Sequence, residues 1–166
     1  IIGMEPALKV ACDRGDNQRI AVWATELTLS EKKFADLMNR FKDEHHIVKV
    51  PCPKLVRMVE DDKLDDTNLV ESVLKEYLKA CDYKNLDSIV LGCTHFPFYT
   101  KYLERLCPNI HIIEGSVGTT LHTKDLLEQK GLLNMSDEIG SITWMNTMES
   151  KIELSKRLFK MLEVEA

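Results

Sequence analysis

The sequence predicts an α/β protein built on a doubly wound parallel sheet with helices on both faces. Three observations indicate this fold class. Short runs of β-branched and other apolar residues recur along the chain, stretches with apolar residues at helical spacing separate them, and the connections between them are short. This alternation is typical of parallel strands joined by crossover helices.

Short apolar segments bounded by turn-forming residues are expected to be the strands. They are residues 1–4, 19–24, 46–50, 89–91, 110–113 and about 141–146. The segment 19–24 reads RIAVWA and is almost wholly apolar, as expected of a strand covered on both faces. Pro51 and Pro53 follow the segment 46–50 and are expected to exclude both a regular helix and a central strand there, because proline has no amide hydrogen.

The helices are placed by their caps and by their apolar spacing. A proline is expected in the first turn of a helix over residues 6–14, and Ser30 is expected to cap a helix over residues 30–43. The longest expected helix covers residues 66–80, with apolar side chains at helical spacing. Further helices are expected over residues 98–106, from the stretch 115–120 to 129, and from about 150 onward.

Composition excludes several classes of function. The chain has 166 residues and a formal net charge of −5, which argues against a nucleic-acid partner. No apolar run approaches the length of a membrane span, and no signal-peptide pattern is present. The five cysteines are odd in number, widely spaced and without a CxxC pair, so we expect no disulfide framework, no metal site and a cytoplasmic location.

Polar side chains follow three of the expected strands. Thr25 and Thr28 follow the segment 19–24, the stretch 52–60 with Glu60 at its end follows 46–50, and the sequence GCTHFP at 92–97 follows 89–91. The carboxyl ends of parallel strands meet at one edge of a sheet, where ligands of such folds bind. This edge is therefore the candidate site. Simpler roles are a helix cap for the threonines and a solvated surface for the carboxylate.

Cys93 has the most distinctive chemistry at this edge. It follows a strand and precedes an expected helix start, where the N-terminus of a helix would lower the pKa of the thiol. His95 is two residues on and could exchange a proton with that thiol or with a ligand. The alternative is an inert, buried cysteine beside a capping Thr94.

The stretch 115–120 (GSVGTT) is rich in small and hydroxyl-bearing residues and precedes an expected helix, so it is a candidate phosphate-binding loop. It lacks the lysine of a P-loop and the full glycine pattern of a dinucleotide site. The pattern therefore does not by itself predict a nucleotide ligand.

The sequence GCTHFP at residues 92–97 closely resembles the signature around the second catalytic cysteine of bacterial glutamate racemases. Residues 2–7 (IGMEPA) resemble the segment that enters the C-terminal domain of that family, and residues 25–28 (TELT) resemble its threonine-bearing substrate loop. The stretch 52–60 resembles a further family segment, and all these matches occur in the family's order. Related aspartate racemases usually carry an acidic residue where His95 stands, which favours glutamate.

The resemblance implies a cofactor-independent interconversion of L- and D-glutamate that supplies D-glutamate for the peptidoglycan of the cell wall. In its two-base mechanism one thiolate removes the α-proton and a thiol on the opposite face returns one. By resemblance Cys93 is one of these catalytic groups, and His95 assists it. The substrate-binding residues that it implies are Thr25, Thr28, Glu60, Thr94 and His95. No lysine motif for pyridoxal phosphate is evident, and no cofactor is expected.

The chain departs from the family in one large respect, since the N-terminal half with its first catalytic cysteine has no counterpart here. Cys12 lies between alanine and aspartate, unlike the Cys-Asn-Thr context of that cysteine. We expect residues 1–113 to form the C-terminal α/β domain and residues 114–166 to be a return segment that completes a second, similar domain. The expected partners are glutamate and the absent half, with a homodimer also considered. The isolated chain is expected not to racemise efficiently.

Two other functions stay open at this stage. One is a non-catalytic binding or assembly module of the same fold, and the other is a different cysteine-dependent enzyme, such as a thiol hydrolase or a phosphatase. A hydrolase would need an oxyanion hole and a Cys–His pair in another geometry. A phosphatase loop would need an arginine soon after its cysteine, whereas the first arginine after Cys93 is Arg105.

Overall fold

The computed structural model describes residues 2, 7–138 and 140–163. The chain divides into two compact units, residues 1–123 and 124–166, and each is described by itself. The expected strand over residues 1–4 and the proline that would open the first helix lie, apart from residue 2, outside the described residues. Among the helices of the described part, none is both long and apolar enough to cross a membrane.

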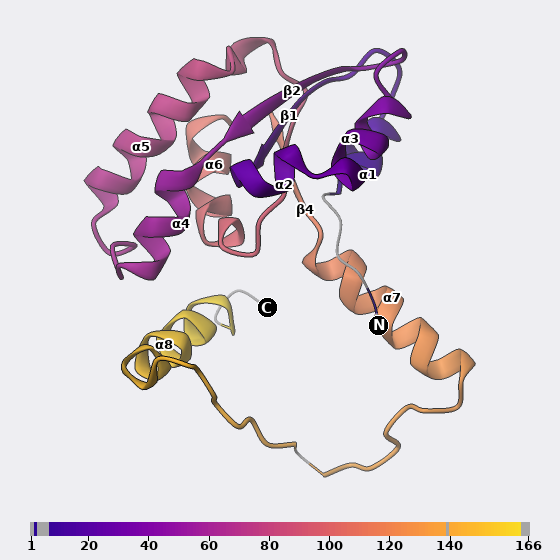
Figure 1. Cartoon of the computed structure of the whole chain (residues 1–166), viewed down its shortest axis with the longest axis vertical. Helices are drawn as coiled ribbons and strands as arrows, with labels where there is room; N and C mark the ends of the chain where they lie inside the picture. The colour runs from indigo at the N-terminus through magenta and orange to yellow at the C-terminus, as the bar shows by residue number, and fades with distance from the viewer. Residues whose placement is uncertain (1, 3–6, 139, 164–166) are drawn as a thin grey trace. The chain divides into compact units, whose positions relative to one another are not determined.

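The first unit is built on a parallel sheet of four strands in the order β2-β1-β3-β4 (Figure 1). The strands are β1 (Arg19–Ala24), β2 (His46–Pro51), β3 (Ser88–Leu91) and β4 (His111–Glu114). The chain leaves β1 toward β2, then crosses back and continues on the other side of β1 through β3 and β4. The predicted doubly wound α/β sheet is confirmed, and its direction of winding reverses between β1 and β3. Ligands of such sheets bind beyond the strand ends at this switch point.

The register aligns the carboxyl ends of three strands. Ala24 lies opposite Pro51, and Trp23 lies opposite Leu91. One further hydrogen bond extends each pairing, because Cys52 N donates to Ala24 O (2.9 Å) and Gly92 N donates to Trp23 O (2.8 Å). The segments that follow β1, β2 and β3 therefore leave the sheet at the same edge.

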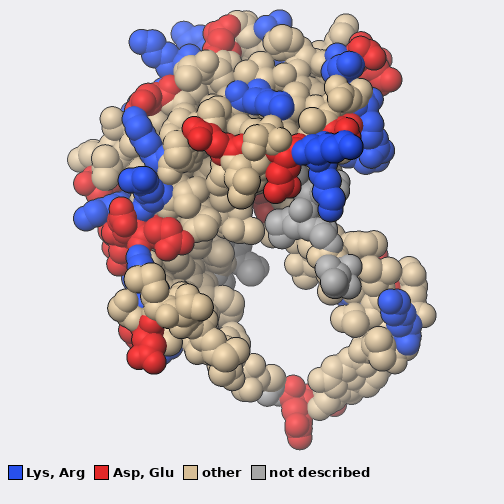
Figure 2. Space-filling model, viewed as in Figure 1, with Lys and Arg blue, Asp and Glu red and all other residues tan. Residues whose placement is uncertain are grey.

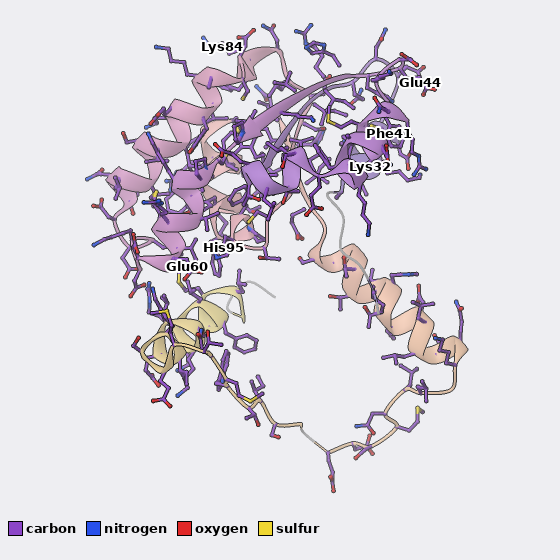
Figure 3. The ribbon with its side chains drawn as sticks, viewed as in Figure 1. Lys32, Phe41, Glu44, Glu60, Lys84 and His95 are labelled. Atoms are coloured by element: carbon purple, nitrogen blue, oxygen red, sulfur yellow. The ribbon has the colours of Figure 1, made fainter. Side chains whose placement is uncertain are left out.

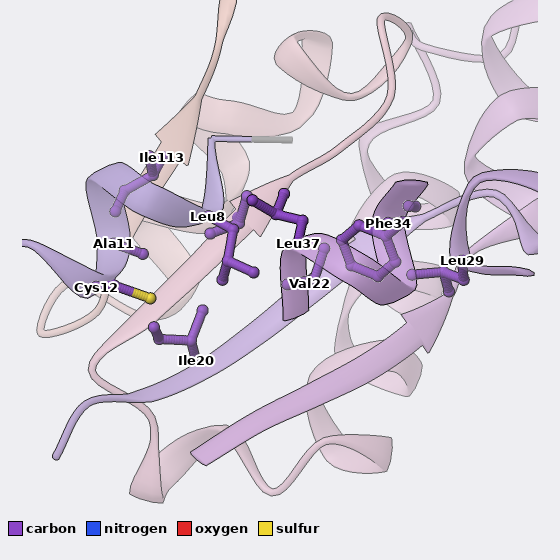
Figure 4. Close-up of a cluster of buried hydrophobic side chains, with 11 residues drawn as sticks. Leu8, Ala11, Cys12, Ile20, Val22, Leu29, Phe34, Leu37 and Ile113 are labelled. Atoms are coloured by element: carbon purple, nitrogen blue, oxygen red, sulfur yellow. The ribbon is translucent and has the colours of Figure 1, made fainter. Parts of the chain in front are cut away.

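Helices cover both faces of the sheet, as predicted. Alternate residues of β1 point to opposite faces. Ile20 and Val22 pack on one face in a buried cluster with side chains of α1 (Leu8–Cys12), α2 (Glu26–Ser30) and α3 (Lys32–Asn39) (Figure 4).

The other face carries Trp23, whose ring lies 5.8 Å from the ring of Tyr77 on α5 (Thr67–Ala80). Helix α5 contacts both α4 (Pro53–Glu60) and α6 (Thr100–Leu106). As predicted, α5 starts just after residue 66, where the Asp66 carboxylate accepts a hydrogen bond from Leu69 N at 3.0 Å. Short 3₁₀ turns, η1 (Tyr83–Asn85) and η2 (Phe96–Tyr99), precede β3 and α6.

Two predictions between β1 and α5 were wrong. The helix expected over 30–43 is present as the shorter α3 (Lys32–Asn39), and Ser30 does not cap it. Ser30 ends α2, which Thr25 caps with an extended backbone and a side-chain oxygen that accepts from Thr28 N at 3.2 Å. The stretch after β2 forms helix α4, because Pro53 occupies its first turn, where no amide hydrogen is needed. Pro51 belongs to β2, which tolerates it as an edge strand.

Two further predictions failed beyond β4. Helix α7 (Ser116–Gln129) begins one residue after Gly115, so the stretch 115–120 belongs to the start of this helix and does not form a separate loop. Residues 141–146 form no strand, because a strand needs a partner edge and these residues pair with none in the described part of the chain. The expected terminal helix is present as a 3₁₀ turn, η3 (Glu149–Lys151), followed by α8 (Ile152–Glu163).

Candidate functional site

Two buried aromatic side chains anchor the turn that carries Cys93. Phe96 and Tyr99 of η2 are both 0% exposed. The Tyr99 hydroxyl donates to Leu55 O at 2.7 Å, which ties this turn to α4. Cys93 and His95 lie just before these anchors and stay partly exposed at the carboxyl edge of the sheet. Sequence reasoning missed this role of Tyr99, because helical spacing does not reveal which buried residue joins two helices.

Three of the expected site residues form one hydrogen-bonded chain. Cys93 Sγ lies 3.7 Å from His95 Nδ1, and His95 Nε2 lies 2.8 Å from Glu60 Oε1. Glu60 is the last residue of α4, so the helix and its Tyr99 contact set the position of the carboxylate. Figure 3 shows Glu60 and His95 side by side. The imidazole thus joins a carboxylate to a thiol, the arrangement that activates a cysteine.

This arrangement changes the pKa values of both titrating groups. Burial is the largest influence on the Cys93 thiol and raises its pKa, but side-chain and backbone hydrogen bonds from His95 and the charge of His95 together bring the pKa below 9.0. The hydrogen bond with Cys93 raises the pKa of His95 to about 9, burial opposes this, and Glu60 adds to it. Each group therefore favours the charged form of the other, a thiolate beside an imidazolium. The causes of the lowering that the structure shows are the hydrogen bonds and the charge of His95, the residue just before η2.

The other four cysteines are buried and unsuited to proton transfer. Burial raises the pKa of the Cys12 and Cys107 thiols to about 11, and it also raises the pKa of Cys52 and Cys81. Of the five, Cys93 alone combines partial exposure with a lowered pKa.

The two threonines follow β1, one of the two strands at the switch point, at the start of α2. The Thr25 and Thr28 hydroxyls lie 3.0 Å apart and the first of them caps α2. Both are partly exposed, and Thr94 is exposed next to Cys93. The structure thus joins Glu60, His95 and Cys93 directly and places the threonines at the same sheet edge. Among the described residues, no group of three or more His, Cys, Asp or Glu side chains could hold a metal ion.

Cys93 is expected to react with iodoacetamide faster than the other cysteines, with a rate that rises with pH through the lowered pKa, because the thiolate is the nucleophile. His95→Asn removes the imidazole hydrogen bond and the charge that lower this pKa, and leaves only the backbone hydrogen bond of residue 95. The rate at pH 7.5 should then fall about tenfold for each unit by which the pKa rises. His46→Asn, at the opposite end of β2, is the matched control. Equal alkylation rates in the two variants would contradict the role given to His95.

The comparisons with known proteins agree on one family name. No family model matches the chain. The chain is 48% identical over 165 residues to the glutamate racemase of Bifidobacterium animalis subsp. lactis, covering 96% of this chain and 64% of that protein. It is 42% identical over 163 residues to the glutamate racemase of Clostridium botulinum, covering 96% of this chain and 63% of the relative. The chain therefore spans somewhat less than two thirds of the length of these relatives.

Solved structures share the fold. A glutamate racemase from Bacillus anthracis aligns with a TM-score of 0.73 at 22% identity, over 93% of this chain and 59% of that one. The Escherichia coli glutamate racemase, solved with L-glutamate and the activator UDP-MurNAc-ala, aligns with a TM-score of 0.69 at 23% identity, over 95% and 60% of the two chains. A glutamate racemase from Francisella tularensis, solved with D-glutamate, aligns with a TM-score of 0.62 at 27% identity, over 72% and 45%.

Proposed function

We propose, from the homology of this chain to glutamate racemases along almost its whole length, that it carries one of the two proton-transfer groups of an enzyme that interconverts L- and D-glutamate. The observation that carries the proposal is the hydrogen-bonded chain from Glu60 through His95 to Cys93. The α-proton of an amino acid is very weakly acidic, so its removal needs a positioned base in the correct protonation state. The lowered pKa of Cys93 favours the thiolate, which is the base that this step needs.

In the proposed reaction the Cys93 thiolate takes the α-proton from one face of glutamate. The C–H bond breaks, an S–H bond forms, and the electron pair stays on the α-carbon until an acid on the opposite face protonates it. In the reverse direction the Cys93 thiol gives its proton to the carbanion, and the imidazolium of His95 stabilises the thiolate that is left. Glu60 holds His95 through Nε2, so that Nδ1 faces the sulfur.

The face of the glutamate α-carbon that lies opposite Cys93 needs a second proton-transfer group. The four buried cysteines do not suit this role. We propose that this group comes from the part of the glutamate racemases that this chain does not span. Residues 114–166 are proposed to complete a second domain with that part. Large apolar side chains that are exposed in this segment support the proposal; they include Leu132, Met135, Ile142, Met145 and Met148.

Glutamate is the proposed substrate, and Thr25 and Thr28 are proposed to bind its polar groups from the end of β1. Their hydroxyls can donate to a carboxylate, and they follow β1, the strand that pairs with the one leading to Cys93. Thr94 and His95 are proposed to line the opposite side of the same site. We propose further that the enzyme is cytoplasmic and supplies D-glutamate to the cell wall. The proposed assembly is a homodimer.

The proposal is tested by following D-glutamate by circular dichroism. The first sample is this chain alone, and the second joins it to the segment of the Bifidobacterium animalis racemase that it does not span. The joined protein should racemise glutamate, and the chain alone should not. Racemisation by the chain alone would contradict the need for a second proton-transfer group from outside this chain. A folded but inactive joined protein would contradict the proposed function.

A further inference from the structure

Helix α4 carries Glu60 at its last position, but it is short and lacks a side-chain cap at its start. It has eight residues, and helices of this length are marginally stable in isolation. Cys52 occupies the N-cap position, and within the described part of the chain its side chain accepts no hydrogen bond from the first turn. The amides of a first turn have no acceptor inside their own helix. The placement of α4, and with it that of Glu60, therefore depends on groups from neighbouring elements.

Two tyrosine hydroxyls from other elements bind adjacent residues in the first turn of α4. The Tyr77 hydroxyl of α5 accepts a hydrogen bond from Lys54 N at 3.2 Å. The Tyr99 hydroxyl of η2 donates to Leu55 O at 2.7 Å. Tyr77 thus satisfies a backbone amide that a capping side chain would otherwise satisfy.

The Tyr77 side chain is itself held by the sheet. It is 9% exposed, and its ring packs against Trp23 of β1. Because β1 pairs with β3, the strand that leads to Cys93, the start of α4 is tied to the same two strands that place the thiol. Burial raises the pKa of the Tyr77 phenol, so its hydroxyl stays neutral while Cys93 titrates.

Lys54 also has a side-chain contact at this point, and that contact is exposed. Its Nζ lies 2.7 and 2.8 Å from the two carboxylate oxygens of Glu76, and more than half of each side chain is exposed. Ion pairs of this kind contribute little to stability. Acidic and basic residues are interspersed over the face of the molecule in Figure 2, as on an ordinary solvated surface. The half-buried hydrogen bond to Tyr77, rather than this ion pair, is therefore expected to fix the first turn of α4.

The position of Glu60 affects the reactivity of Cys93 through His95. The hydrogen bond with Cys93 raises the pKa of His95, and Glu60 adds to this effect. Burial raises the pKa of Cys93, but the hydrogen bonds and the charge of His95 outweigh it. A displaced Glu60 would leave His95 less positively charged, and the pKa of Cys93 would then rise.

We propose that Tyr77 is a positioning residue, whose hydroxyl caps α4 and so holds Glu60 against His95 and keeps Cys93 reactive. The proposal rests on the proposed function in one respect, because it takes Cys93 to be the proton-transfer group. Tyr77 takes no part in proton transfer itself. Its effect should therefore be seen in the protonation of Cys93 and should depend on the Glu60 carboxylate.

The test is the pH profile of alkylation of Cys93 by iodoacetamide, followed by mass spectrometry of the labelled peptide. Tyr77→Phe removes the hydroxyl and keeps the ring that packs on Trp23. At pH 7.5 its rate should fall about two- to threefold, whereas at about pH 10, where the thiolate prevails in both proteins, the rate should stay unchanged. Tyr83→Phe is the matched control, because it makes the same change in η1, before β3, whereas Cys93 follows that strand. Its profile should be that of the native protein.

A second comparison places the same change in a Glu60→Gln background. Glu60→Gln removes the carboxylate charge that acts on His95, so it should slow alkylation at pH 7.5 by itself. Adding Tyr77→Phe to it should cause no further fall, since the proposed route from Tyr77 to Cys93 passes through that carboxylate.

A pH profile in Tyr77→Phe that matches that of Tyr83→Phe would overturn the proposal. Equal slowing at every pH would also overturn it, because it would show altered access to the thiol rather than altered protonation. An equal fall with and without the Glu60 carboxylate would show that Tyr77 acts by another route. Glutamate takes no part in this experiment, so a failure of the proposed racemisation would be seen separately from a failure here.

Discussion

Replacing Cys93 with alanine is expected to reduce glutamate racemisation by the joined protein at least about a thousandfold, which corresponds to about 4 kcal/mol of transition-state stabilisation. The variant removes the one cysteine that is partly exposed and hydrogen bonded to an imidazole. His95 Nδ1 lies 3.7 Å from the sulfur, so no other group of the hydrogen-bonded chain occupies the position of the thiol. The measurement is the initial rate of loss of circular dichroism from each enantiomer.

Cys107→Ser is the matched control for this experiment. The Cys107 thiol is buried and donates to Leu103 O at 2.8 Å, a bond that a serine hydroxyl can also make. This variant should keep most of the activity. Retention of more than about a tenth of the native rate in Cys93→Ala would exclude Cys93 as a proton-transfer group.

Replacing Trp23 with alanine is expected to lower the free energy of unfolding by about 3–5 kcal/mol. Trp23 is 0% exposed in β1, and its ring packs against Tyr77 of α5, so truncation leaves a cavity between the sheet and that helix. Because domains are stable by only about 5–15 kcal/mol, this is a large share of the total. Urea unfolding followed by far-ultraviolet circular dichroism measures the change.

Leu27→Ala serves as the control, since Leu27 is a large apolar residue that is 72% exposed in α2. It should change the free energy of unfolding by less than about 0.5 kcal/mol. A similar small change in Trp23→Ala would show that the contact between Trp23 and Tyr77 does not hold α5 on the sheet.

The sheet could be predicted because its strands are short, apolar and locally bounded. The boundaries of β1 agree with the expected segment 19–24, and α5 (Thr67–Ala80) agrees closely with the helix expected over 66–80. The errors arose where a residue's role depends on its neighbours in space. Proline marks a break in a sequence, but Pro51 ends an edge strand and Pro53 begins a helix. Likewise, Thr25 and Ser30 both have hydroxyl groups, and only the backbone shows which of them caps a helix.

The candidate site was predictable in part. The position of Cys93 after a strand of a parallel sheet placed the thiol at a ligand-binding edge from physical reasoning alone. Its reactivity was not predictable in this way, because an inert buried cysteine fits the same local sequence. The contact between Glu60 and His95 joins residues 35 positions apart and depends on how α4 and η2 pack, through Tyr99 and Leu55. The family resemblance supplied Glu60 before the structure showed its partner.

The most direct test of the central claim is the exchange of the α-hydrogen of glutamate in deuterated water, followed by proton magnetic resonance. D- and L-glutamate are incubated separately with the joined protein and with its Cys93→Ala variant. If Cys93 serves one face of the α-carbon, the native protein exchanges both enantiomers, and the variant loses exchange for one of them while the other still exchanges. Equal exchange of both enantiomers by the variant would contradict the assignment of Cys93 as the base of one face.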